Sequence, residues 1–265
     1  MSRLVVLKLG GSVITLKDAD KKEVDVKNLA RLAKEIAEAK KEKDFQLIIV
    51  HGAGPFGHVP AKKYELDKGL KSELQLRGFS ATHRSMEELN SAVVDSLIAA
   101  GINAIAYQPS AAGILKNKKL TYFPTIVLKK LLKVGMVPVA HGDVLIDEET
   151  GVNILSGDHL VPYLAKKLHA KRIILATDVD GVFDSDPKDN KTATLIREIT
   201  HRNIGSLNVG GAKATDVTGG MRRKLNELLQ LAEGGIESEI ISAKRPGLLK
   251  RALLGEEGLG TLISR

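Results

Sequence analysis

Two glycine-rich segments carry the residue types needed to bind an anion. Residues 10–12 read Gly-Gly-Ser after an apolar run, and residues 52–58 read Gly-Ala-Gly-Pro-Phe-Gly-His after another. Glycine lets the backbone turn sharply and approach a bound group closely, and inward-pointing backbone N–H groups attract anions. Lys8 and Lys17 flank the first segment, and His58 closes the second. Because lysine supplies a compact charge and histidine a proton near neutral pH, the pattern favours an anionic substrate.

These segments also fit a plainer structural interpretation. A glycine-rich turn with a surface histidine would give the same residues at 52–58, and the two lysines could be solvated. The first segment lacks the Gly-Lys-Ser/Thr of a Walker P-loop and the Gly-x-Gly-x-x-Gly of a dinucleotide site. The residues alone leave both interpretations open.

Three later motifs could complete a site for a phosphorylated ligand. Ser-Gly-Asp at 156–158 opens a predicted helix, and free N–H groups at a helix start suit an anion. Asp158 could cap that helix, orient the lysines, or do both. The acidic turn at 177–182 follows a predicted strand and suits the ribose and base of a nucleotide, although it could also hold a metal or form a simple turn.

The third motif opens a helix at 218–221, whose first turns carry Arg222, Arg223 and Lys224. Basic residues at this end oppose the helix dipole. Their presence is easier to understand if a polyphosphate binds there.

Apolar runs alternate with helical patterns along most of the chain. The expected strands are residues 4–9, 46–50, 102–108, 137–140, 172–177, 237–242 and 260–264. The expected helices are residues 25–43, 85–100, 124–134, 158–168 and 219–233, with a hairpin at 144–155. This alternation predicts an α/β fold with a mainly parallel sheet covered on both faces, and ligands at the carboxyl ends of its strands.

The segment between the second glycine motif and the helix predicted at 85–100 is polar and mixed. It runs from Ala61 to Ser80, with Gly69 and Gly78 as helix breakers, and could cover the site as a lid.

The composition excludes several classes of protein. The chain has 265 residues, 43% of them hydrophobic and none of them cysteine, so disulfides and thiolate metal sites are excluded. No apolar run is long enough to span a membrane, and no signal peptide is recognisable; a cytoplasmic protein is expected. The net charge is +8, but basic and acidic residues are mixed and aromatics make up only 3%. Nucleic-acid binding therefore ranks below small-molecule chemistry.

Taken together, the motifs resemble the amino acid kinase superfamily. They occur in that family's order, as Lys-Leu-Gly-Gly-Ser at 8–12, Gly-Ala-Gly at 52–54, Ser-Gly-Asp at 156–158, Thr-Asp-Val-Asp-Gly-Val at 177–182 and Thr-Gly-Gly-Met-x-x-Lys at 218–224. Within it, four segments are most similar to isopentenyl phosphate kinases, chiefly archaeal ones: 11–17, 52–58, 108–111 and 142–144. Pro55 departs from the pattern, because serine is expected there. It stiffens the segment and removes one N–H donor.

The resemblance implies a three-layer αβα sandwich with a mainly parallel central sheet, the amino acid kinase fold, as one domain over residues 1–265. A phosphate-acceptor lobe is expected at about 1–170 and a nucleotide lobe at about 171–265. The implied activity is ATP-dependent phosphorylation of isopentenyl phosphate to isopentenyl diphosphate, in a mevalonate-type route to isoprenoids. ATP, Mg²⁺, a prenyl monophosphate and a homodimer follow from the same resemblance, with neither nucleic acid nor membrane as a partner.

The resemblance also assigns roles to residues. The catalytic residues would be Lys8, Lys17, His58 and Asp158, with Asp158 positioning the two lysines. The substrate phosphate would lie against Ala53, Gly54, His58 and Gly157. ATP would be held by Lys8, Gly10, Gly11, Ser12, Gly54, Asp178, Phe183, Gly220 and Lys224. No protein ligand of Mg²⁺ is named.

Phosphoryl transfer needs placement and charge neutralisation more than covalent chemistry. A phosphate acceptor is already nucleophilic at neutral pH, so His58 is predicted to act mainly as a charged hydrogen-bond donor. The prenyl tail needs an apolar slot, for which Met86, Leu89 and Val93 are candidates, although core packing explains them equally well.

Other functions remain open on the same residues. A related kinase could act on a carboxylate, on UMP or on fosfomycin; His58 argues against carboxylate kinases, whereas fosfomycin kinases are the hardest to exclude. A non-catalytic nucleotide or anion binder is a second class, against which the joint presence of Lys8, Lys17, Asp158 and Lys224 argues. A nucleic-acid-binding protein is a third class, and a steep dependence of its affinity on salt would reveal it.

Overall fold

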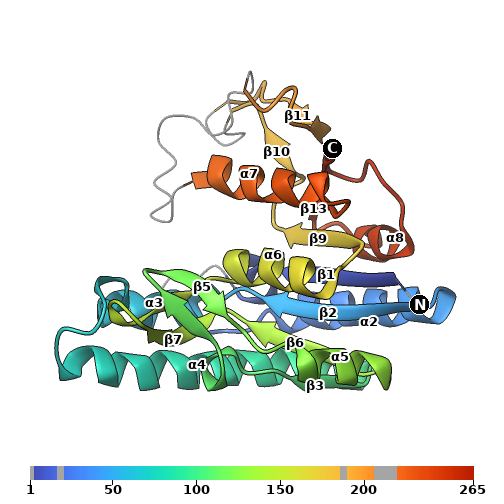
Figure 1. The fold of residues 1–265 in the computed structure, drawn as a ribbon. Coiled ribbons are helices and arrows are strands. Elements are labelled where there is room, and N and C mark those ends of the chain that lie inside the picture. Colours follow the sequence, from blue (N-terminus) through green and yellow to red (C-terminus); the bar gives the residue numbers. More distant parts are fainter. Residues whose placement is uncertain (1–2, 17–20, 186–189, 206–219) are drawn as a thin grey trace.

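The computed structural model describes residues 3–16, 21–185, 190–205 and 220–265 (Figure 1). Its strands are β1 (Arg3–Leu9), β2 (Phe45–His51), β3 (Ala104–Ala106), β4 (Ile114–Lys116), β5 (Lys119–Tyr122), β6 (Val137–His141), β7 (Asp143–Asp147), β8 (Gly151–Leu155), β9 (Arg172–Thr177), β10 (Val182–Phe183), β11 (Leu195–Ile196), β12 (Glu198–Ile199), β13 (Glu237–Ser242) and β14 (Thr261–Ile263). Its α-helices are α1 (Gly11–Ile14), α2 (Val26–Glu42), α3 (Gly54–Lys63), α4 (Glu73–Ala99), α5 (Ile126–Lys133), α6 (Gly157–Leu168), α7 (Gly220–Glu233) and α8 (Leu248–Leu254). Two short 3₁₀ helices are η1 (Leu66–Lys68) and η2 (Pro109–Ala111).

An eight-stranded sheet forms the centre of the fold, in the order β12-β14-β13-β9-β1-β2-β6-β3. Neighbouring strands are parallel at every pairing except β13 with β14. The mainly parallel sheet expected from the alternation of strands and helices is therefore confirmed. β1 lies between β9 and β2, so the residues that follow it are at the middle of the sheet edge.

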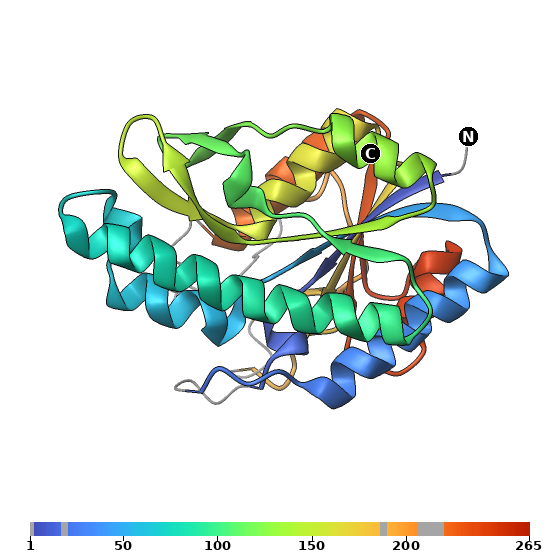
Figure 2. The same cartoon turned by 90° about the horizontal axis from the view of Figure 1, so that it is seen from below.

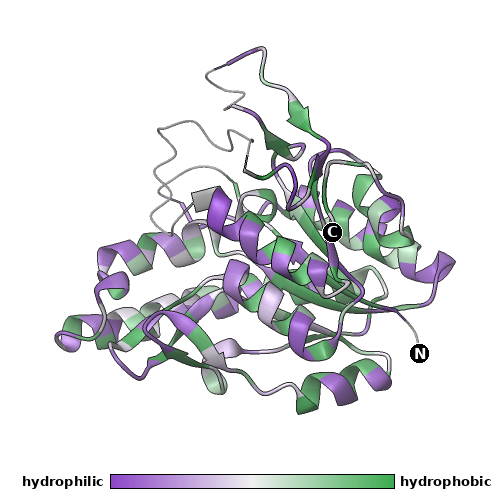
Figure 3. Ribbon diagram, turned by 45° about the horizontal axis from the view of Figure 1, so that its top comes forward, coloured by the Kyte–Doolittle hydropathy of each residue, from purple (hydrophilic) through white to green (hydrophobic). Residues whose placement is uncertain are grey.

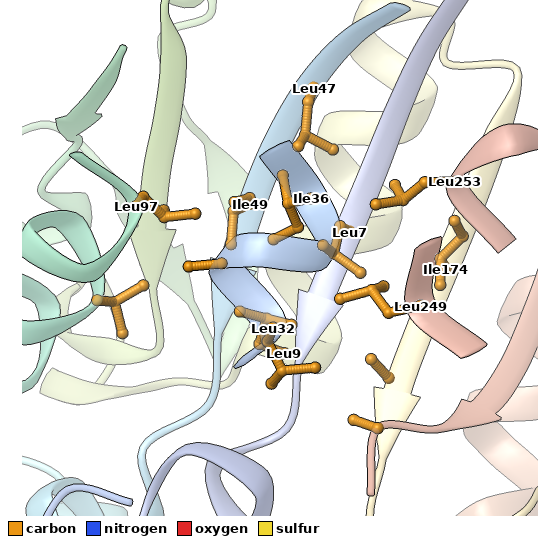
Figure 4. Packing of buried hydrophobic residues seen from close by; sticks show 14 of the residues in the cluster. Leu7, Leu9, Leu32, Ile36, Leu47, Ile49, Leu97, Ile174, Leu249 and Leu253 are labelled. Carbon is orange, nitrogen blue, oxygen red and sulfur yellow. The ribbon is translucent and has the colours of Figure 1, made fainter. Parts of the chain in front are cut away.

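Helices cover both faces of this sheet, which gives three layers (Figure 2). Side chains alternate between the two faces along a strand, and β1 follows this rule. Leu7 and Leu9 pack with α2, α4 and α8 on one face, where Figure 4 shows them among other leucines and isoleucines. Leu4 and Val6 pack with α5, α6 and α7 on the other. The same alternation directs Lys8 to the α6 face.

The hydropathy of the elements agrees with these layers. The central strands are hydrophobic along most of their length, whereas the helices alternate between hydrophilic and hydrophobic residues (Figure 3). A strand buried on both faces reads as a continuous apolar run, which is why β1, β2 and β9 are recognisable from sequence. Within the described ranges, no helix combines the length and the apolar character that crossing a membrane would require.

A second, four-stranded sheet is ordered β5-β4-β7-β8. Its β7 and β8 form the antiparallel hairpin predicted at 144–155. The strand predicted at 102–108 is shorter than expected, because β3 spans only Ala104–Ala106.

Helix α4 begins at Glu73, well before the start predicted at residue 85. Residues 61–80 were expected to be irregular, but α4 starts at Glu73, where Ser72 and Gln75 form a capping box. Gly78 therefore lies inside the helix and does not break it. A β-carbon at Gly78 would lie 2.3 Å from the Cβ of Tyr64. The glycine permits close packing against the end of α3, and this tertiary reason is not visible in the local sequence.

Gly78→Ala tests this explanation of the glycine. In an open helix the change would stabilise the protein by up to about 1 kcal/mol, but the clash at this position is expected to destabilise it by about 1–3 kcal/mol. Denaturant unfolding measures the difference, with Ser80→Ala on the exposed face of α4 as the matched control. If Gly78→Ala were as stable as Ser80→Ala, close packing would not explain the glycine.

Candidate active site

The two glycine-rich segments lie against each other at the carboxyl ends of β1 and β2. A β-carbon at Gly11 would lie 2.3 Å from the backbone nitrogen of Gly54, and one at Gly52 would lie 2.6 Å from the nitrogen of Gly11. No real side chain tolerates such distances, so both positions require glycine. Gly54 also has a φ of +50°, a conformation that other residues rarely adopt. The segments predicted separately from sequence therefore form one backbone surface.

This surface presents backbone N–H groups without partners. Helix α1 begins at Gly11 and α3 at Gly54, and the first N–H groups of a helix have no partner within it. In the described part of the chain, the N–H groups of Gly11, Ser12, Ala53 and Gly54 donate no hydrogen bond. Such a cluster can hold the oxygens of a phosphate.

The N–H groups border a cleft of about 1050 Å³. Most of the predicted site residues line it: Lys8, Gly10, Gly11, Ser12, Ala53, Gly54, His58, Gly157, Asp158 and Asp178. These residues come from the ends of β1, β2 and β9 and from the starts of α1, α3 and α6. Ligands of open α/β sheets are expected at this edge.

Asp158, which lines the cleft, pairs with two lysines. Its Oδ1 atom accepts hydrogen bonds from the Nζ atoms of Lys8, at 2.6 Å, and Lys224, at 2.8 Å. The capping of α6 falls to Ser156, whose Oγ accepts from the N–H of Asp158 at 3.1 Å. The side chain of Asp158 therefore bonds to lysines and does not cap α6, which were the two roles that the sequence left open.

The charges of this cluster shift the pKa values of its members. Burial, followed by the charge of Lys224, lowers the pKa of Lys8, although Asp158 opposes both effects. Burial alone would raise the pKa of the Asp158 carboxyl, but the two ammonium groups outweigh it and hold that pKa well below its usual range. The carboxylate is therefore ionised at neutral pH. Two ammonium groups on one carboxylate give the cluster a net positive charge.

His58 lies on α3 and remains accessible from the cleft. Partial burial, followed by the charge of Lys8, lowers the pKa of its imidazole. Pro55 lies in the first turn of α3, where a helix makes no use of the missing N–H. The proline therefore costs the helix no hydrogen bond, but it leaves one donor fewer at this end.

Four of the predicted residues are not placed on the cleft surface. Lys17 lies outside the described residues, and Gly220 is known only as the first residue of α7. Phe183 lies on β10, paired with β11, and is not among the residues that line the cleft in the described part of the chain. Lys224 reaches the site through Asp158.

Of the three candidates for a tail pocket, Met86 borders the cleft. All three residues are fully buried in one core cluster. Core packing explains Leu89 and Val93, as the sequence had allowed, whereas Met86 belongs to both the core and the lining of the cleft.

Arg223 and His159 line the cleft, although neither was assigned a specific role from the sequence. A guanidinium nitrogen of Arg223 lies 3.2 Å from Nε2 of His159, and both side chains line the cleft. Burial, followed by the charge of Arg223, lowers the pKa of His159. The only sequence signal was the unfavourable placement of basic residues at the start of α7, which marked Arg223 without giving it a role.

Comparison with known proteins gives the chain its family. The amino acid kinase family matches residues 3–242. An isopentenyl phosphate kinase of Methanothermobacter thermautotrophicus is 43% identical over 98% of this chain and 99% of its own length. The chain belongs to the amino acid kinase family, within its isopentenyl phosphate kinases. A second isopentenyl phosphate kinase, from Methanocaldococcus jannaschii, is 37% identical over 96% of each chain.

The fold of this isopentenyl phosphate kinase family member matches solved structures of its relatives. A chain from X-ray structures of an isopentenyl phosphate kinase superposes with a TM-score of 0.85 at 42% identity, covering 98% of this chain and 100% of the other. The match confirms the amino acid kinase fold and the resemblance recognised from the sequence.

The described residues of this kinase family member contain no group of three or more histidine, aspartate or glutamate side chains that could hold a metal ion. Asp158, which lines the cleft, is already bonded to two ammonium groups.

Proposed function

We propose that this protein transfers the γ-phosphoryl group of ATP to isopentenyl phosphate, giving isopentenyl diphosphate and ADP. An oxygen of the acceptor phosphate forms a bond to the γ-phosphorus, and the bond from that phosphorus to the β–γ bridging oxygen breaks. The observation that carries the proposal is the meeting, at one cleft, of the two glycine-rich segments with Lys8 and Asp158, the latter also paired with Lys224. Such a reaction belongs to a mevalonate-type route to isoprenoids.

The acceptor phosphate is proposed to lie at the start of α3. The N–H groups of Ala53 and Gly54 have no partner among the described residues, and the side chain of His58 adds a donor from α3. Gly157 lines the same cleft beside Lys8, since a β-carbon there would be in van der Waals contact with the Cε of Lys8, at 3.5 Å. The phosphate oxygen is itself a nucleophile, so these groups bind and orient and need not remove a proton.

The transferring group is proposed to lie between the acceptor and the lysine cluster. Lys8 would neutralise charge that develops on the γ-phosphoryl oxygens, and Asp158 holds its ammonium in place. Gly10, Gly11 and Ser12 would bind the ATP phosphates. The roles predicted from the sequence also remain proposals for five further residues: Lys17, Asp178, Phe183, Gly220 and Lys224. The division into an acceptor lobe and a nucleotide lobe at about residue 170 is likewise a proposal.

Mg²⁺ is proposed to enter with ATP. It would supply charge neutralisation on the phosphates. The described residues provide no ready-made cage for it, so Lys8 and Lys224 would share that task. The cytoplasmic location and the homodimer also remain predictions.

The prenyl tail has an apolar wall available beside His58. Val59 and Met86 line the cleft from α3 and α4, and Ile154 lines it from β8. A short hydrocarbon chain could lie here and displace water from apolar surface. These side chains also give a reason for a prenyl phosphate to bind better than an amino acid.

Turnover across a panel of acceptors tests the proposal. ADP release with Mg²⁺ would be followed with isopentenyl phosphate, dimethylallyl phosphate, fosfomycin, acetylglutamate and UMP. Activity confined to the prenyl phosphates is expected. Activity on fosfomycin alone would leave the proposed ATP site unchanged but would give His58 a different acceptor. ATP binding without turnover of any acceptor would favour a non-catalytic binder.

Proton uptake on substrate binding tests the role of His58. Its lowered pKa makes the imidazole mostly neutral at pH 7.5 in the free protein, and a phosphate dianion beside it favours the charged form. Binding is therefore expected to take up protons, and affinity to fall as pH rises through the pKa of the bound state.

Calorimetry of isopentenyl phosphate binding at pH 7.5, in buffers of different ionisation enthalpy, counts these protons. A phosphate monoester with a second pKa near 6 is almost fully a dianion at this pH, so the protons go to the protein. His58→Gln removes the titrating group and is expected to abolish the uptake. Equal uptake in both proteins would contradict the assignment.

A further inference from the structure

A buried pair of histidines lies beneath the cleft, at the ends of two neighbouring strands. His51 ends β2 and His141 ends β6, and the two are register partners. Their rings stack with centroids 5.4 Å apart, and only 0% and 2% of the two residues is exposed. Each precedes a glycine that lines the cleft, Gly52 or Gly142. The proposed reaction uses neither histidine directly.

The partners of His51 fix the position of its proton. Nδ1 lies 3.0 Å from the carbonyl oxygen of Gly52, which can only accept, so Nδ1 carries the hydrogen. Nε2 lies 3.1 Å from Nδ2 of Asn90, which can only donate. Asn90 is oriented in turn, since the same Nδ2 donates to the carbonyl of Val139 at 3.2 Å.

The ring also stays neutral. Burial, followed by the neighbouring His141, lowers the pKa of His51 to about 3. His51 is thus a neutral imidazole with its hydrogen on Nδ1 over the whole physiological pH range.

This hydrogen bond sets the orientation of the peptide unit between Gly52 and Ala53. The described part of the chain has no cis peptide bonds, and in a trans unit the C=O and N–H groups point in opposite directions. Because the Gly52 carbonyl turns toward the buried ring of His51, the N–H of Ala53 points away from it. That N–H has no partner among the described residues, and Ala53 lines the cleft.

We propose that His51 is a positioning residue for the acceptor phosphate. Its Nδ1–H group donates a hydrogen bond to the Gly52 carbonyl and so orients the Ala53 N–H toward the cleft. Asn90 keeps the ring in the required tautomer by donating to Nε2. The inference rests on the proposed function and adds to it a residue that touches no substrate. His141 repeats the arrangement on β6, where its Nδ1 donates to the carbonyl of Gly142 at 2.9 Å.

Two amide substitutions separate the two nitrogens of the ring. His51→Asn keeps a donor close to the Nδ1 position and loses the group that faces Asn90, whereas His51→Gln keeps an acceptor near Nε2 and loses the donor to Gly52. Both bury one amide in place of the ring, so their effects on stability are expected to be comparable. Leu97→Ala, a core change on the same helix as Asn90, gives a destabilised control away from the cleft.

Steady-state kinetics of the full chain give the first readout. His51→Gln is expected to raise the KM for isopentenyl phosphate by about 10-fold to 100-fold, as for loss of a hydrogen bond to a charged group. The KM for ATP should stay within about threefold, and His51→Asn should recover most of the loss. Equal KM values for isopentenyl phosphate in the Gln and Asn variants, or in the Gln variant and Leu97→Ala, would overturn the proposal.

The amide of Ala53 gives a second readout that needs no turnover. In protein labelled with ¹⁵N-alanine, inorganic phosphate is expected to shift the Ala53 amide resonance of the wild type and of His51→Asn, but not of His51→Gln. The ¹⁵N shifts of the His51 ring should report the Nδ1–H tautomer from pH 5 to pH 9. An Ala53 resonance that phosphate leaves unmoved in the wild type would overturn the role of His51. If the wild type bound phosphate this way but failed to phosphorylate isopentenyl phosphate, only the proposed function would fall.

Discussion

Lys8→Met is expected to lower kcat with isopentenyl phosphate by about 10²-fold to 10³-fold, the usual effect of removing one group that stabilises charge in a transition state. The ammonium of Lys8 is held at the cleft by Asp158 at 2.6 Å and is mostly shielded from water. It is therefore in place before the reaction begins. Because the ammonium acts on charge that grows during transfer, the KM for isopentenyl phosphate should change far less than kcat.

The fold should survive this substitution. Asp158 keeps its ion pair with Lys224 at 2.8 Å, so no buried carboxylate is left without a partner, and methionine retains the apolar stem of lysine. Lys40→Met is the matched control, since Lys40 is a partly buried lysine that donates to a backbone carbonyl away from the cleft. Normal kcat in Lys8→Met, or an equal loss in both variants, would contradict the role of Lys8.

His58→Ala is expected to lower kcat/KM for isopentenyl phosphate by about 10²-fold. The imidazole is accessible from the cleft, and it lies close enough to Lys8 for that charge to lower its pKa. It would donate to a phosphate oxygen in both the ground state and the transition state. The loss should therefore be divided between KM and kcat, unlike the loss in Lys8→Met.

A conservative variant and a control variant are compared with His58→Ala. His58→Gln retains a neutral donor and should recover part of the activity, by an amount that depends little on pH. His201→Ala removes an exposed histidine outside the cleft and should have no effect. If His58→Ala turned over isopentenyl phosphate at the normal rate, the acceptor phosphate would have to bind elsewhere.

The sequence predicted the fold well, because its strongest signals are local. β1, β2 and β9 are buried on both faces and read as continuous apolar runs, and the glycine segments follow the first two of them. The rule that ligands bind at the carboxyl ends of parallel strands then placed the residues of one cleft together. Period-two alternation on β1 explains why Lys8 faces α6 while Leu7 and Leu9 enter the core.

Contacts between distant segments could not be predicted in the same way. Asp158 was expected to position Lys8 and Lys17. Among the described residues its lysine partners are Lys8 and Lys224, and the second of these depends on how α7 packs on α6. Lys17 itself lies outside the described residues. Phe183 was expected at the nucleotide; it lies on β10 and is not among the described residues that line the cleft, so its role stays a prediction.

Gly78 shows a different limit of sequence reasoning. It was interpreted as a helix breaker because glycine lowers helix propensity. Its actual environment is the side chain of Tyr64, a tertiary contact that overrides propensity. The tautomer of His51 could not be predicted for the same reason, since His51 ends β2 and its partner Asn90 lies on α4.

The identity of the products tests the central claim most directly. ³¹P NMR of the wild-type protein with ATP, Mg²⁺ and isopentenyl phosphate would follow all phosphorus species at once. The account predicts that the signals of isopentenyl diphosphate and ADP grow together in equal amounts, as the isopentenyl phosphate signal declines. ADP with free inorganic phosphate, or ATP consumption that leaves isopentenyl phosphate unchanged, would contradict phosphoryl transfer to this acceptor.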